Sequence, residues 1–156
     1  MRQSVTIFLI ISIIAGLIAC DRKKVFEAYH RIDKNGWNKD SVVVFNVHLS
    51  DTIKNHNLYV NIRNKGNYPY SNIYLFLSIG SPDGTTRIDT VEFTLADPSG
   101  KWRGSGIGGL HDNQIPYKSS VYFPHKGDYK FTIKQGMRDN VLQGIRDVGF
   151  RVETTY

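Results

Sequence analysis

The residues from Gly104 to Gly109 read GSGIGG and match G-x-G-x-x-G, the pattern of a dinucleotide-binding turn. That turn needs a helix that begins at its last glycine, so that the helix N-terminus faces the pyrophosphate. The segment after Gly109 has no apolar repeat of helical period, and Pro116 interrupts it. We therefore predict no bound nucleotide. We expect a sharply bent connection instead, with Trp102 at one end, because glycine adopts positive φ without strain.

Other residues that could perform chemistry lack productive spacing. None of the histidines belongs to a Cys-x-x-Cys or His-x-x-x-His cluster, so we expect no zinc. Ser105 lies between glycines, but other residues occupy the outer positions of the nucleophile-elbow pattern. Asp89, Glu92 and Asp97 could act as paired glycosidase carboxylates only if the fold brought two of them together. We predict no enzymatic activity, no cofactor and no metal. The histidines are His30, His48, His56, His111 and His125.

The start of the chain is typical of an exported lipoprotein. Arg2 precedes the apolar run VTIFLIISIIAGLIA, which is shorter than the roughly 20 residues that span a bilayer, as in a secretory signal. The run ends in LIAC, which resembles the lipobox, in which cleavage before the cysteine leaves a thiol that carries lipid. Cys20 is the chain's single cysteine. We predict lipidation of Cys20, with palmitate among its acyl chains, and stable membrane anchoring.

Charge gives little support for a nucleic-acid partner. The whole chain carries a formal net charge of +6, and removal of residues 1–19 takes away Arg2 alone. The basic residues are scattered apart from DRKK (Asp21–Lys24), and no basic stripe or recognition helix is present. We predict residues 1–19 as signal peptide, residues 20–24 as acylated N-terminus and tether, and residues 25–156 as one domain.

The hydrophobic pattern of the domain has a period of two, which is typical of half-buried strands. Turn-forming Gly, Pro, Asn and Asp residues separate the segments. This spacing predicts an all-β, antiparallel β-sandwich of jelly-roll or immunoglobulin-like topology. One short helix is expected at Gly136–Ile145, where apolar residues recur at helical spacing. The expected strands are residues 41–50, 57–64, 73–80, 90–96, 119–124, 129–135 and 148–154.

Four aromatic residues lie in or beside turns, namely Trp37, Tyr68, Tyr70 and Trp102. Exposed Tyr and Trp favour protein interfaces or stacking on sugars. Two interpretations stay open. In one, these side chains form a contact surface; in the other, Trp102 closes the end of the sandwich and Tyr68 and Tyr70 cover a turn.

Three longer stretches give a family resemblance. They are IRNKGNYPYSNIYLFL (Ile62–Leu77), DTVEFTLADPSGKWRGSGIGGL (Asp89–Leu110) and GDYKFTIKQGMRDNVLQGIRDVGFRVE (Gly127–Glu153). With the preceding lipobox, they resemble the gliding-motility lipoprotein GldH family of Bacteroidetes. The resemblance covers most of the domain in the family's order, and Arg138 lies in its last motif.

The resemblance implies a role in the envelope machinery for surface gliding and the linked type IX secretion system. It supplies no catalytic residue or cofactor, and it assigns lipidation to Cys20. We therefore expect a non-enzymatic component or accessory that contacts other envelope proteins, with Tyr68, Tyr70, Trp102 and Arg138 as candidate contact residues. We expect it at the periplasmic face of a membrane, with the outer membrane favoured over the inner. The alternatives are an envelope carbohydrate-binding module with exposed Tyr68, Tyr70 and Trp102, and an envelope hydrolase.

Overall fold

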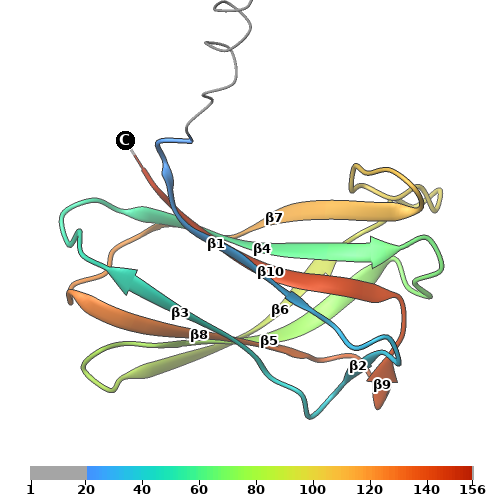
Figure 1. Cartoon of the computed structure of the whole chain (residues 1–156), viewed down its shortest axis with the longest axis horizontal. Coiled ribbons are helices and arrows are strands. Elements are labelled where there is room, and N and C mark those ends of the chain that lie inside the picture. Colours follow the sequence, from blue (N-terminus) through green and yellow to red (C-terminus); the bar gives the residue numbers. More distant parts are fainter. Residues whose placement is uncertain (1–20, 156) are drawn as a thin grey trace, which may run out of the picture.

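The structure is a computed structural model that describes residues 21–155. The predicted signal peptide and Cys20 lie outside the described residues, as does Tyr156. The described residues form strands and loops (Figure 1). The strands are β1 (Lys24–Arg31), β2 (Trp37–Asn38), β3 (Val43–Leu49), β4 (His56–Lys65), β5 (Asn72–Gly80), β6 (Thr86–Thr94), β7 (Leu110–Val121), β8 (Gly127–Gln135), β9 (Val141–Leu142) and β10 (Ile145–Thr154).

The eight long strands form two four-stranded antiparallel sheets. One has the order β1-β10-β4-β7 and the other β3-β8-β5-β6, while β2 and β9 form a separate two-stranded ribbon. The pairs are nested along the chain: the first long strand pairs with the last, the second with the seventh, the third with the sixth and the fourth with the fifth. This nesting is that of a jelly roll, in which one long hairpin is rolled into two sheets. The all-β sandwich prediction is therefore confirmed, and the strand order is the jelly-roll order.

The connections divide between the two ends of the sandwich (Figure 1). Residues 32–42, 66–71, 95–109 and 136–144 connect strands at one end, which we call the loop-bearing end. Residues 50–55, 81–85 and 122–126 connect strands at the other end, where β1 begins and β10 finishes; we call it the terminal end. Three of the four loop-bearing connections are longer than any at the terminal end.

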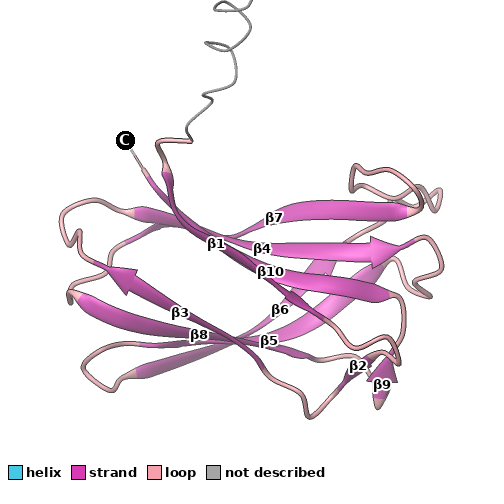
Figure 2. Cartoon of the chain, viewed as in Figure 1, coloured by secondary structure: helices cyan, strands magenta, loops and turns pink. Residues whose placement is uncertain are grey.

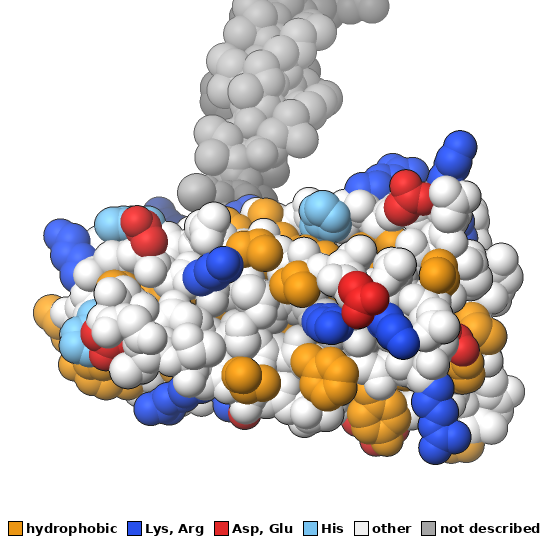
Figure 3. Space-filling model, turned by 90° about the horizontal axis from the view of Figure 1, so that it is seen from below, with side chains coloured by type: hydrophobic (Ala, Val, Ile, Leu, Met, Phe, Trp, Pro, Cys, Tyr) orange, Lys and Arg blue, Asp and Glu red, His pale blue; other side chains and the backbone are white. Residues whose placement is uncertain are grey.

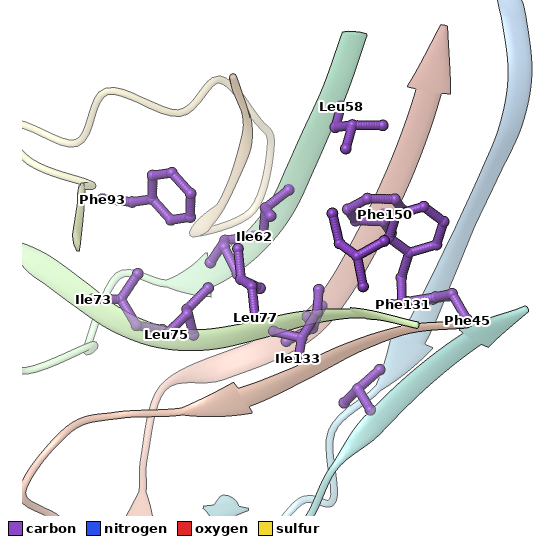
Figure 4. Packing of buried hydrophobic residues seen from close by; sticks show 14 of the residues in the cluster. Phe45, Leu58, Ile62, Ile73, Leu75, Leu77, Phe93, Phe131, Ile133 and Phe150 are labelled. Carbon is purple, nitrogen blue, oxygen red and sulfur yellow. The ribbon is translucent and has the colours of Figure 1, made fainter. Parts of the chain in front are cut away.

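The core lies between the two sheets, and aromatic rings from both sheets meet in it (Figure 4). Phe131 of β8 stacks on Phe150 of β10 with ring centroids 4.4 Å apart, and Phe45 of β3 lies 6.2 Å from Phe150. Leu75, on β5, is also fully buried. Each such side chain contributes about 1.5–3 kcal/mol through burial, so the alternating pattern of these strands is what holds the sheets together.

The expected helix at residues 136–145 is wrong. Residues 21–155 contain strands and loops, without any helical segment that could cross a membrane (Figure 2). The buried Gln135 side chain donates to the carbonyl of Asp139 (2.8 Å) and accepts from the N–H of Met137 (2.8 Å), which folds this segment into a turn. β9 then pairs with β2, and Gly144 takes φ +84°. The helical spacing of apolar residues arose from a turn followed by a short strand.

Gly144 is fixed by a close approach to Tyr68. A Cβ at this position would lie 2.6 Å from the Cα of Tyr68, in a conformation with positive φ. Gly84, in the β5–β6 turn, has a similar φ of +86°, and a Cβ there would meet nothing within 4 Å. A side chain at position 84 would therefore meet backbone strain alone, whereas one at position 144 would meet both backbone strain and a steric clash.

We predict that Gly144→Ala lowers the free energy of unfolding by about 3 kcal/mol or more, and Gly84→Ala by about 1 kcal/mol. The first change adds a clash with Tyr68 to the strain that both share. Urea titration of the full-length protein, followed by tryptophan fluorescence, measures both values. Equal losses for the two variants would contradict the close approach.

Candidate functional site

Tyr68 lies inside the loop-bearing end and not on its surface. Its side chain is 4% exposed and belongs to the hydrophobic core. Its hydroxyl donates to the carbonyl of Asn72 at 2.9 Å and so closes the β4–β5 turn. Burial raises the pKa of Tyr68. Tyr68 is therefore too buried to be a contact residue itself, and its ring packs against those of Tyr70 and Trp102.

Tyr70 and Arg138 are both exposed, and Asp139, the residue after Arg138, connects their two loops. Tyr70 is 36% exposed, and its hydroxyl donates to Oδ2 of Asp139 at 2.8 Å. This hydrogen bond, together with desolvation, raises the pKa of Tyr70. The buried Gln135 side chain donates to the carbonyl of Asp139, so the loop that carries the exposed Arg138 has a defined position. Sequence reasoning missed Asp139, although it directly follows Arg138.

Trp102 packs beside Tyr68, which in turn contacts Tyr70. Its ring lies 6.2 Å from Tyr68 and 5.5 Å from His111, and Tyr68 in turn lies 5.8 Å from Tyr70. Trp102 is half-buried and forms an isolated bridge with Ala96. The fold thus brings Tyr68, Tyr70 and Trp102 together, whereas the fourth aromatic, Trp37, is buried on β2. A flat sugar-stacking platform would need all three exposed, and the burial of Tyr68 prevents these three from forming one.

The glycine-rich segment is a bent loop, as the sequence predicts. Ser105 forms a bridge with Asp112, and the chain reverses between them. A Cβ on Gly106 would lie 1.9 Å from the carbonyl oxygen of Leu110, and Gly108 has φ +67°. β7, a strand, follows Gly109 where a dinucleotide fingerprint has a helix.

Each of the three candidate carboxylates contacts a different set of residues. Asp89 accepts from Tyr117 and pairs with Lys118 at 2.8 Å, and these two contacts lower its pKa. Glu92 accepts hydrogen bonds from Asn72 and Tyr74 on the neighbouring strand. Asp97 accepts three hydrogen bonds within its own turn. Their partners come from different segments, so the contacts give no sign of a carboxylate pair.

The histidines are also distributed over the molecule. His48 pairs with Asp128 at 2.7 Å, and His125 with Asp83 at 3.2 Å. Within residues 21–155, no group of three His, Cys, Asp or Glu side chains is arranged to hold a metal ion.

An ionic network holds the start of the described chain on the outer face of the β1-β10-β4-β7 sheet. Arg151 is buried and pairs with Glu27 at 2.9 Å, with Glu153 at 2.7 Å and with Asp21. The hydrogen bond from Arg151 lowers the pKa of Asp21. The backbone adds a contact, because Thr154 donates to the carbonyl of Lys23 at 2.9 Å. Asp21 directly follows Cys20, so the predicted lipidation site adjoins a fixed point of the domain.

The outer face of the β3-β8-β5-β6 sheet is a second exposed surface (Figure 3). Val44, Tyr74, Phe76 and Ile88 are its exposed apolar side chains. Lys, Arg, Asp and Glu side chains lie among the hydrophobic ones in Figure 3. The apolar side chains of this face therefore do not form one continuous hydrophobic patch.

Fold and surface together define a jelly-roll domain whose ordered, exposed loops gather at one end. Comparison of the sequence with protein families matches the GldH lipoprotein family over residues 24–152. The chain belongs to this family, and the family resemblance seen in the sequence is confirmed.

Two relatives agree with this assignment. The "Gliding motility lipoprotein GldH" of Flavobacterium johnsoniae is 41% identical over 144 residues, which cover 88% of this chain and 89% of that one. The "Gliding motility lipoprotein GldH homolog" of Christiangramia forsetii is 39% identical over 160 residues, which cover 98% of each chain.

Solved structures show weaker similarity. An exo-β-1,3-galactanase from Phanerochaete chrysosporium matches 83% of this chain and 26% of its own, with a TM-score of 0.43 and 13% identity. A carbohydrate-binding module, CBM28, specific for non-crystalline cellulose matches 81% of this chain and 70% of its own, with a TM-score of 0.41 and 6% identity. TM-scores at this level carry no argument about function.

We predict that Tyr68→Ala lowers the free energy of unfolding by about 3 kcal/mol, whereas Tyr70→Ala lowers it by about 1 kcal/mol. Tyr68 leaves a cavity in the core, while Tyr70 loses an exposed hydrogen bond. Urea denaturation of both variants tests the two roles. A larger loss for Tyr70→Ala than for Tyr68→Ala would contradict them.

Proposed function

We propose that the protein is anchored through lipid on Cys20 to a membrane of the cell envelope, with residues 1–19 removed as signal peptide. In this proposal it is a non-enzymatic component or accessory of the gliding and type IX secretion machinery. It works through protein contacts made by the loop-bearing end, where Tyr70, Arg138 and Trp102 lie. The names of the two relatives support the motility role.

The observation that carries the proposal is the placement of the two ends. Asp21 is pinned near the terminal end by Arg151, and the exposed loops lie at the other end of the strands. Strands of about ten residues rise by about 3.3 Å per residue, so the loops lie about 30 Å away along the sandwich. A lipid on Cys20 would leave these loops free for a partner.

We predict that the wild-type protein incorporates a palmitate analogue and sediments with membranes, and that Cys20→Ala does neither. The substitution removes the thiol that carries the lipid, and its effect on the folded domain should be small because Cys20 precedes it. Metabolic labelling and membrane fractionation, with separation of inner and outer membranes, measure both properties. Soluble release of the wild-type protein would contradict the anchor.

We predict that a photo-crosslinking amino acid at Arg138 captures other envelope proteins, and that one at Lys126 does not. Lys126 is an exposed residue of the terminal end and serves as the matched control. Deletion of the gene should abolish spreading on agar and secretion of type IX cargo, and Arg138→Glu should restore both less well than the wild type. Equal capture from both positions, or a deletion that leaves spreading and secretion intact, would contradict the proposal.

A further inference from the structure

A cleft lies beside the glycine-rich loop at the loop-bearing end. The end of β1, the β4–β5 turn, the start of β10 and the segment Gly108–Leu110 line it, and its volume is about 510 Å³. A second cleft of about 410 Å³ shares Arg31 and Arg146 with the first and reaches Ile107. We call the two together the basic cleft. Volumes of this size are typical of ligand sites.

Cations outnumber carboxylates in the basic cleft. Five cationic side chains line it, against three carboxylates. Arg63 engages two of those three, Asp112 at 2.9 Å and Asp147 at 3.9 Å. Arg31, Lys34 and Lys65 have no ion pair with any residue of the described chain. The cleft therefore presents positive charge that the protein itself does not neutralise.

Arg146 lines both parts of the basic cleft with a side chain that is about one third exposed. Its Nε is buried and has no hydrogen-bond acceptor within residues 21–155, and Oδ2 of Asp147 lies 3.7 Å away. A buried donor without an acceptor costs about 1–3 kcal/mol. The exposed part of the guanidinium adds to the positive charge of the cleft.

The walls of the basic cleft are held in place by backbone hydrogen bonds. Gly66 donates to the carbonyl of Gly109 at 2.9 Å, and Ile32 donates to that of Arg146 at 2.9 Å. The β4–β5 turn, the glycine-rich loop, β1 and β10 are thus linked before any ligand binds. Such preorganisation reduces the entropic cost of binding.

Ile107 provides an apolar contact at the rim. It occupies the tip of the glycine-rich loop and is 94% exposed. An apolar side chain beside several cations favours a ligand that combines carboxylates with apolar groups. A polypeptide has this combination, whereas inorganic phosphate and acidic polysaccharides lack the apolar part.

We infer that the basic cleft binds an acidic segment of a protein partner, with carboxylates on Arg31, Lys34, Lys65 and Arg146 and an apolar side chain against Ile107. The cations extend over both clefts, which suits several carboxylates along one chain. The inference rests on the proposed function, because it names the chemistry of the partner that the loop-bearing end contacts.

The test measures binding of a fluorescein-labelled peptide of Glu and Leu residues to the full-length protein in detergent, by fluorescence anisotropy. The double variant Arg31→Glu/Lys34→Glu and the uncharged change Ile107→Ser should each weaken binding about tenfold or more. Lys126→Glu/Lys130→Glu makes the same charge change on exposed residues away from the cleft and should have little effect. A peptide with Lys in place of Glu should not bind.

Equal weakening by the two double variants, or no effect of Ile107→Ser, would overturn the inference in favour of unspecific charge attraction. Stronger competition by alginate or inorganic phosphate than by unlabelled peptide would overturn the peptide as occupant. Absence of peptide binding, while crosslinks from position 138 persist, would overturn the inference and leave the proposed function standing.

Discussion

Alternation of strand direction in the nested pairing is the constraint on which the rest of the structure depends. Because each long strand runs opposite to the one before it, successive connections must appear at alternate ends of the sandwich. The pairing of β10 with both β1 and β4 then places the start and the finish of the domain at one end. Three of the seven connections between the long strands lie at this terminal end, and the other four lie together at the loop-bearing end. Segments far apart in sequence meet there for this topological reason: Tyr68, Trp102 and Arg138 lie on three different connections.

The core makes this arrangement stable through contacts that the hydrophobic pattern encodes directly. β5 and β8 alternate cleanly, and the predicted ranges 73–80 and 129–135 lie within the observed strands. β7 was predicted only at residues 119–124, because Pro116 and the polar Asn113 interrupt its apolar pattern. Pro116 fits because β7 is an edge strand, where proline is tolerated if no ladder hydrogen bond is required. Asn113 can be buried because its side chain donates to the carbonyl of Ile62 at 3.1 Å and to Asn64 at 3.0 Å, both on β4. Local pattern cannot reveal such long-range satisfaction.

The sequence predicted the candidate contact residues only in part, because local pattern does not reveal which side chains the fold buries. Tyr70 and Trp102 were predicted as aromatic residues in turns, and Arg138 as part of a family motif. The structure places all three at the loop-bearing end. Tyr68 has the same residue type and neighbourhood, yet Gly144 approaches it closely and it is buried. The cations of the basic cleft went unnoticed because Arg31, Lys65 and Arg146 are scattered in sequence. Only the pairing of β10 with β1 and β4 brings them beside the glycine-rich loop.

The Arg151 network gives the proposed anchor a mechanical consequence. Three carboxylates surround one buried guanidinium; burial alone disfavours its charge, but hydrogen bonds to Asp21 and Glu153 outweigh that effect and raise its pKa. Arg151 therefore stays charged, and Asp21 is held against β10. A lipid attached one residue earlier would leave the domain little freedom to move away from the membrane, in contrast to a lipoprotein with a long flexible linker. Contacts at the loop-bearing end would then be limited to partners within a narrow range of distances from the bilayer. The proposed attachment and the inferred peptide site in the basic cleft would thus favour the same kind of interaction, a positioned contact within an assembly.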